Sequence, residues 1–214
     1  MTSAERVPHD EYTASLFDRR EHAAPKYPTS ARPWSKVTGI CLHQTACHMG
    51  ERLERYNTIG AHFVVTRSGK VLWMHGLERL VVHGNGWNNQ TVGIEIDGLY
   101  AGIEGDQRTV WNNPDTQHRE MGMEVTVEAM ESARQLVRWI VAEVALRGGK
   151  LTKLVAHRQS SDSRRNDPGS AIWKAVALPL HAELGLSDGG VGFKIGSGYA
   201  IPSEWDPRCT GIKY

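Results

Sequence analysis

Cysteine is scarce in this chain, and its three cysteines form no recognisable framework. Cys41, Cys47 and Cys209 are an odd number among 214 residues, and no two of them form a CxxC pair. Small secreted folds held by disulfides carry more cysteines at closer spacing. The sequence therefore argues against a disulfide framework and favours thiols that are mostly buried.

Long apolar runs and an excess of one charge are missing as well. No stretch approaches the roughly 18 consecutive apolar residues of a membrane span, and no apolar segment of a Sec-type signal follows the N-terminus. The formal net charge is +1, which gives no reason to expect nucleic acid or an anionic membrane as a partner. We therefore expect synthesis in a cytoplasm without a Sec signal, so that action outside it would need a separate means of release.

What the chain does have is an ordinary globular composition and many histidines. Hydrophobic residues make up 40% of it and charged residues 23%, which suits a domain with a substantial core. We expect an N-terminal extension packed on the domain (1–34), a main domain (35–186) and a Gly-rich C-terminal tail (187–214). Ten histidines, several of them beside apolar strands, make a metal or acid–base site a reasonable hypothesis. The sequence does not indicate an oligomeric state.

Strand-like and helix-like segments alternate along the chain. Single strands are expected at 37–43, 91–96 and 151–156. A β-hairpin with Ser68-Gly69 at its turn is expected at 61–75. Helices are expected around 11–20, 126–147 and 171–184, the last of them kinked or interrupted at Pro179, and a helical turn or two is expected at 49–56. Residues 98–124 show little periodicity and are interpreted as an irregular insertion. The class is therefore α/β, with a mixed central β-sheet flanked by helices.

Two of the expected strands end in histidine, and a carboxylate follows the second. His43 ends the first strand and His157 the last, and Asp167 lies in the polar loop that reads H-R-Q-S-S-D-S-R-R-N-D-P-G. Two imidazoles and one carboxylate, with a fourth position open to water, are typical of catalytic zinc. The alternative is two core histidines satisfied by the backbone and an aspartate that starts a turn before Pro168.

Four segments resemble zinc-dependent N-acetylmuramoyl-L-alanine amidases, which share a fold with peptidoglycan recognition proteins and phage amidase lysozymes. They read G-I-C-L-H-Q-T-A (39–46), A-H-F-V-V-T-R-S-G-K-V (61–71), N-N-Q-T-V-G-I-E-I-D-G (88–98) and V-A-H-R...R-R-N-D-P-G...I-W (155–173). They follow the family's order and span roughly residues 35–185. The resemblance implies a peptidoglycan-recognition-protein-like amidase fold, a Zn²⁺ cofactor and a peptidoglycan or muropeptide substrate. The bond cleaved would be the amide between N-acetylmuramic acid and L-Ala.

The resemblance also implies roles for individual residues. The three matches to zinc ligands are His43, His157 and Asp167. Glu95 matches a glutamate that lies near the zinc-bound water and transfers protons. Arg165 falls where many members carry lysine, and it would hydrogen-bond the developing oxyanion. Ala61 stands where the phage-lysozyme branch has a catalytic tyrosine, so the chain resembles the branch that uses glutamate.

Some residues near the expected site have weaker assignments. Four are candidates for substrate contact: His62, His83, Trp87 and Asn88. The alternation around His62 allows an outward position, although a structural role fits it better than metal binding. His83 and Asn88 lie in a loop, and Trp87 fits either the substrate site or the core. We expect Arg164 to be solvated.

Two biological roles and one non-catalytic role are compatible with these features. A phage or prophage endolysin is the first, slightly favoured by the extension and the tail. A cytoplasmic amidase that recycles soluble anhydro-muropeptides is the second. A recognition module that binds muropeptides without cutting them is the third, and the presence of all three ligand matches argues against it.

Overall fold

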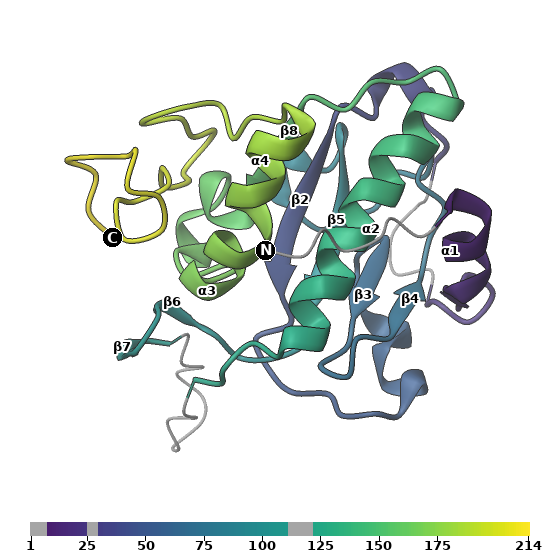
Figure 1. Cartoon of the computed structure of the whole chain (residues 1–214), viewed down its shortest axis with the longest axis horizontal. Coiled ribbons are helices and arrows are strands. Elements are labelled where there is room, and N and C mark those ends of the chain that lie inside the picture. Colours follow the sequence, from purple (N-terminus) through teal and green to yellow (C-terminus); the bar gives the residue numbers. More distant parts are fainter. Residues whose placement is uncertain (1–7, 25–29, 111–121) are drawn as a thin grey trace.

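The fold is built on a mixed six-stranded sheet (Figure 1). The computed structural model describes residues 8–24, 30–110 and 122–214. The strands lie in the order β1-β4-β3-β5-β2-β8, with β3 and β4 antiparallel and the other neighbours parallel. Their bounds are β1 Phe17–Asp18, β2 Gly39–Gln44, β3 Phe63–Val65, β4 Val71–Trp73, β5 Thr91–Ile96 and β8 Lys153–Ala156. The mixed sheet expected from the sequence is thus confirmed.

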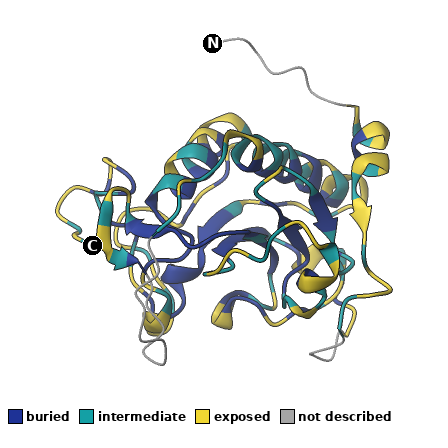
Figure 2. Cartoon of the chain, turned by 90° about the horizontal axis from the view of Figure 1, so that it is seen from below, coloured by how far each residue is buried: buried dark blue, intermediate teal, exposed yellow. Residues whose placement is uncertain are grey.

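One face of this sheet is covered by helices. Helix α2 (Val127–Leu146) lies across it, and its buried side chains share the main core with Leu42 of β2 and Ile94 of β5. Figure 2 shows that the strands in the interior of the molecule are mostly buried. Strand side chains alternate between faces, so the neighbours of Leu42 and Ile94 along their strands, His43 and Glu95, point to the opposite face. The alternation therefore separates an apolar face under the helices from a face that is free to carry polar chemistry.

Helix α2 agrees with the expected helix at both ends. The Thr126 hydroxyl accepts a hydrogen bond from the Ala129 N–H, which satisfies one of the free donors of the first turn. Beyond Arg147, Gly148 adopts a left-handed conformation with φ of 78°, which a residue with a side chain rarely adopts. These local signals are readable in the sequence and fix the length of the helix.

The last helical segment is continuous through its proline. Helix α3 (Ser170–Ile172), a π-helical stretch (Trp173–Ala177) and α4 (Leu178–Leu184) follow one another without a break. The kink or interruption expected at Pro179 corresponds to the π-helical stretch, which ends two residues before the proline; a proline inside a helical segment removes a backbone hydrogen bond and is a common cause of such irregularity. The irregularity lies just before it, in the π-helical stretch.

Three other local expectations need correction. The N-terminal helix is α1 (His9–Ser15), and the chain then enters β1 instead of continuing to Arg20. The turn expected at 49–56 is a 3₁₀ helix, Leu53–Thr58. Part of the expected irregular insertion is an antiparallel hairpin, β6 (Ala101–Ile103) and β7 (Asp106–Val110); residues 111–121 of it lie outside the described residues. The other 3₁₀ helices are Trp34–Lys36, Asn85–Trp87, His157–Gln159 and Asp162–Arg164.

Both ends of the described chain pack on the domain. Tyr12 of α1 is buried in the main core, and the Trp139 indole N–H donates to the Thr13 hydroxyl at 2.9 Å. In the tail, Trp205 is fully buried and its indole N–H donates to the Gly102 carbonyl of β6. The Gly-rich tail is therefore part of the folded unit.

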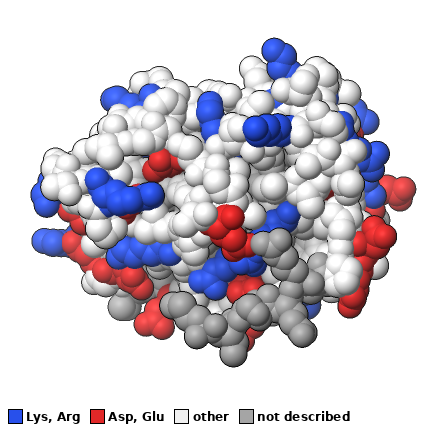
Figure 3. Space-filling model, turned by 45° about the horizontal axis from the view of Figure 1, so that its top comes forward, with Lys and Arg blue, Asp and Glu red and all other residues white. Residues whose placement is uncertain are grey.

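The surface and the helices place some limits on partners. On the face shown in Figure 3, basic and acidic side chains are interspersed with uncharged surface, in keeping with the net charge of +1. Among the described residues, no helix combines the length and the apolar character that crossing a membrane requires.

Candidate metal centre and active site

The candidate site lies where three parallel strands end. His43 is in β2, Glu95 in β5 is its register partner, and His157 directly follows β8. Residues paired in register point to the same face of a sheet, so His43 and Glu95 share the face opposite α2. Parallel strands bring their carboxyl ends to one edge, and this brings residues far apart in sequence into one cluster.

His43, His157 and Asp167 have the spacing of a metal-ligand set. Their ligand atoms are separated by 3.0 Å (Nδ1 to Nδ1), 2.9 Å (His157 Nδ1 to Asp167 Oδ2) and 3.7 Å (His43 Nδ1 to Asp167 Oδ2). Tetrahedral zinc, with bonds of about 2.0–2.1 Å, separates its ligands by roughly 3.3 Å. All three residues are buried. The sequence-predicted ligands therefore lie together at distances that suit one small cation.

The protonation of His157 supports the same interpretation. Its Nε2 lies 2.9 Å from Asn85 Oδ1, an oxygen that can only accept a hydrogen bond. A neutral ring with its proton on Nε2 leaves a lone pair on Nδ1, facing the Asp167 carboxylate. Two acceptors in contact are unfavourable unless a cation or a proton lies between them. A metal ion bound by the two groups would remove this conflict.

The charge states of the other two ligands also fit a metal. Burial is the main cause that lowers the pKa of His43 to about 4, although Asp167 opposes it; the ring is thus neutral at pH 7. Burial by itself would raise the pKa of Asp167, but the two neighbouring imidazoles, His157 and His43, outweigh it and hold the pKa below its usual range. Metals bind neutral imidazole and ionised carboxylate, so both groups are in the form that a metal requires.

Gln44 is a structural residue of the site that the sequence did not reveal. Its backbone N–H donates to Asp167 Oδ1 at 2.9 Å, and its side-chain amide donates to the Asn166 carbonyl at 2.9 Å. The side-chain oxygen accepts from the Tyr100 N–H. Gln44 thereby ties the ligand loop to β2. A polar residue after His43 was the available signal, but its partners depend on where the loop runs.

Glu95 has the environment of a proton-transfer group. Its Oε2 is buried and finds no hydrogen-bond partner among the described residues. Burial, reinforced by the Asp167 carboxylate, raises the pKa of Glu95 well above its ordinary value, and the charge of Arg164 acts in the opposite direction. A carboxyl group with a raised pKa beside a metal-ligand set is a common feature of catalytic sites.

The two neighbouring arginines of the ligand loop have different surroundings. The Arg165 guanidinium lies over the rings of Tyr214 and Tyr199, 4.7 and 5.4 Å from their centroids. The charge of Arg164, in contrast, lowers the pKa of both His43 and Glu95. Arg164 is half-buried and its charge acts on both groups, whereas Arg165 is exposed; the oxyanion role of Arg165 stays a prediction.

The four candidates for substrate contact turn inward. His62 is fully buried, accepts from the Gly93 N–H and lies 3.0 Å from the Arg79 carbonyl, so the outward position is wrong. Trp87 is fully buried. The Asn88 side-chain oxygen accepts from two backbone N–H groups of its own loop. His83 is buried, with Nδ1 3.0 Å from His43 Nε2. These residues shape the site from within.

An open groove of about 660 Å³ lies beside the ligand loop. The hairpin β6–β7 forms one of its sides, and the loop residues Arg165 and Asn166 with Tyr214 of the tail form another. The tail therefore contributes to a groove beside the ligand loop, and none of the three candidate metal ligands lines this groove.

Comparison with known proteins identifies the family. Residues 33–170 match the family described as N-acetylmuramoyl-L-alanine amidase. The chain belongs to this family. No curated protein sequence matches. The fold is also found in solved structures, and those named below are 14–18% identical to this chain, so that the likeness concerns the fold alone.

Endolysin amidases and peptidoglycan recognition proteins both occur among these structures. One is the endolysin amidase LysCS of Clostridium intestinale, at 15% identity and a TM-score of 0.54, covering 80% of this chain and 96% of that one. Another is Drosophila peptidoglycan recognition protein LB, at 18% identity and a TM-score of 0.52, covering 80% and 95%. A third is peptidoglycan recognition protein LE in complex with tracheal cytotoxin, at 14% identity and a TM-score of 0.53, covering 82% and 97%.

Proposed function

We propose that this protein is a zinc-dependent amidase that hydrolyses the bond between N-acetylmuramic acid and L-Ala in peptidoglycan. The observation that carries the proposal is the buried cluster of His43, His157 and Asp167 at metal-ligand spacing. Its position beside Glu95 in a member of the amidase family supports catalysis over binding alone. A zinc ion held by this cluster would supply Lewis acidity, which activates water and polarises the scissile carbonyl.

The residues of the chain then have separate tasks. Glu95 accepts the proton of the attacking water and delivers it to the departing amine nitrogen of L-Ala, so that the amide C–N bond breaks without releasing a strong base. Its raised pKa suits both transfers. The positive charge of Arg164, which acts on Glu95 and His43, favours the negative charge that develops on the carbonyl oxygen. Gln44 keeps the Asp167 carboxylate in place.

Dye release from labelled cell wall tests the proposal. We expect release by the zinc-loaded protein and its loss in His157→Ala, by more than the roughly 100-fold that loss of a ligand's outer partner can cost. His22→Ala is the matched control, because His22 is exposed and far from the cluster in sequence. Elemental analysis should find zinc in the wild type and in the control. A zinc-loaded wild type that releases no dye but still binds muropeptides would instead indicate a recognition module.

For such an amidase, we propose the lytic role of an endolysin: the protein would be made in the cytoplasm and then released to act on the cell wall. The groove beside the site is open, which suits a polymeric substrate. The alternative is recycling of soluble anhydro-muropeptides. Rates on insoluble sacculi and on soluble anhydro-muropeptide separate the two, since a recycling enzyme should prefer the soluble substrate strongly.

A further inference from the structure

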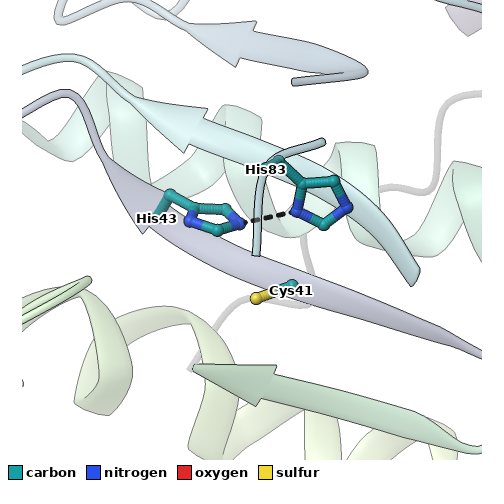
Figure 4. Close-up of side chains that lie close together, drawn as sticks. All are labelled: Cys41, His43 and His83. Carbon is teal, nitrogen blue, oxygen red and sulfur yellow. Dashed lines mark hydrogen bonds between the residues drawn. The ribbon is translucent and has the colours of Figure 1, made fainter. Parts of the chain in front are cut away.

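One short loop reaches the outer nitrogens of both candidate histidine ligands. We call residues 83–88 the support loop. In it, His83 Nδ1 lies 3.0 Å from Nε2 of His43 (Figure 4). Asn85 Oδ1 lies 2.9 Å from Nε2 of His157. In both histidines the contacted nitrogen is the one that does not face Asp167.

The direction of the hydrogen bonds from His43 through His83 follows from the backbone carbonyl at the end of the series. His83 Nε2 lies 3.3 Å from the Thr91 carbonyl oxygen, which can only accept. A neutral His83 therefore carries its proton on Nε2 and accepts at Nδ1. His43 must then donate from Nε2, which leaves the lone pair of its Nδ1 directed at the other ligands. Asn85 imposes the same arrangement on His157.

The support loop is itself held firmly. The Asn88 side-chain oxygen accepts from the N–H groups of His83 and Gly84, at 2.9 and 2.7 Å. The Ser160 hydroxyl donates to the Gly84 carbonyl at 2.8 Å. Asn85 adopts a left-handed conformation with φ of 54°, which asparagine tolerates better than most residues. The loop can therefore hold its two contacts in a fixed geometry.

The sheet below the loop leaves room for His83. A Cβ atom placed on Gly93 of β5 would lie 2.6 Å from Cγ of His83, far closer than non-bonded carbon atoms approach. Only glycine at this strand position lets the His83 ring rest on the sheet beside His43. The sequence of β5 is thus adapted to the support loop as well as to Glu95.

We propose that His83 and Asn85 are positioning residues that fix the tautomer and the orientation of the two histidine ligands. The inference rests on the proposed zinc site, which it deepens. Partners of this kind orient ligand rings and raise their basicity, and their loss typically weakens metal binding 10–100-fold. The support loop, rather than the substrate groove, is then the reason for these two polar residues.

A second metal site is the competing interpretation of His83. Cys41 Sγ, a nitrogen of His43 and a nitrogen of His83 lie within 4.8 Å of one another (Figure 4). An ion there would have to share His43 with the first site and displace the proton between His43 and His83. The 3.0 Å nitrogen separation and the acceptor at Thr91 fit an intact hydrogen bond, so we expect one zinc ion per chain.

Paired substitutions at His83 test the positioning role. In His83→Asn the side-chain oxygen can take the place of Nδ1 as acceptor, whereas His83→Leu has a similar shape and no acceptor. We expect zinc to bind His83→Leu roughly 10–100-fold more weakly than wild type, with rescue in His83→Asn, measured by competition with a chromophoric chelator. The absorption spectrum of the cobalt-substituted protein should change in the Leu variant only. Saturating zinc added to the Leu variant should restore most of its kcat, with little change in its KM.

Asn85 provides an independent pair that does not disturb the core. Asn85→Asp keeps an acceptor oxygen, and Asn85→Gly removes it without straining the left-handed backbone. We expect weaker zinc binding in the Gly variant only. A wild type that binds no zinc defeats the proposed function; a wild type that binds one zinc ion with the same affinity as both His83→Leu and Asn85→Gly defeats the positioning role alone. Two zinc ions per chain, one of them lost in Cys41→Ser, would replace it with the second metal site.

Discussion

At the scale of single residues, Glu95 offers a direct test of proton transfer. Glu95→Gln keeps the shape of the side chain and removes the group that takes the proton. We expect turnover to fall roughly 10²–10⁴-fold while zinc content stays at the wild-type level, measured by dye release and elemental analysis. Because Oε2 is buried without a partner, the variant should unfold at an equal or higher denaturant concentration. Unchanged turnover would assign proton transfer to another group.

The two neighbouring arginines predict different pH profiles. The charge of Arg164 lowers the pKa of Glu95, so Arg164→Gln should raise that pKa and move the acid limb of the kcat/KM profile to higher pH. Arg165→Gln should leave the limb in place, because Arg165 packs over Tyr214. A shift in the Arg165 variant alone would return the oxyanion role to Arg165.

The residues of the site were not equally predictable. His43 and His157 mark strand ends in short apolar runs, and Asp167 lies in a motif with fixed neighbours, so their order along the chain carried the information. Gln44 and Asn85 act through partners 122 and 72 residues away, and such partners depend on the path of loops. The inward turn of His62 and Trp87 depended in the same way on packing.

At the scale of elements, the N-terminal cap of α2 is a local feature with a local cost. Thr126→Ala removes the hydroxyl that accepts from the Ala129 N–H and should lower the free energy of unfolding by about 1 kcal/mol. Val127→Ala is the control: Val127 is 72% exposed, so the change should stay within about 0.5 kcal/mol. Urea denaturation measures both, and equal losses would argue against the cap.

Elements were predictable where their pattern was strong. The apolar face of α2 and the apolar strands β2, β5 and β8 repeat at the period of their structure. The hairpin β6–β7 was missed because most of β7 is polar and exposed or half-buried, with only Val110 buried. The tail shows no periodicity, and its attachment through Trp205 is a tertiary contact.

At the scale of the whole molecule, buried histidines predict sensitivity to acid. Burial lowers the pKa of His43 to about 4 and lowers those of His62 and His83 well below the usual value. Below a pH of about 6.5 the unfolded chain therefore binds protons that the folded protein does not. Each such histidine should cost metal-free protein about 1.4 kcal/mol of stability per pH unit as the pH falls from about 6.5 to 4. Glu95, whose pKa burial raises, acts in the opposite direction, but it is one group against three, so the net change should be a loss.

Denaturant midpoints in chelator, taken from about pH 8 to 4.5, measure this loss. His22→Gln should reproduce the wild-type slope, because His22 is exposed. A midpoint that stays constant between about pH 6.5 and 4.5 would contradict the prediction.

The distance in sequence between His43 and His157 has a consequence for the unfolded chain. The two residues are 114 positions apart, so an ion bound to both would act as a removable link in a protein with no disulfide among its described residues. The unfolded chain does not hold these two residues together, so binding of the ion by the folded protein would add directly to the free energy of unfolding. Chelation of such an ion would therefore remove a link that spans more than half of the polypeptide, so that one ion would contribute to stability as well as to the proposed chemistry.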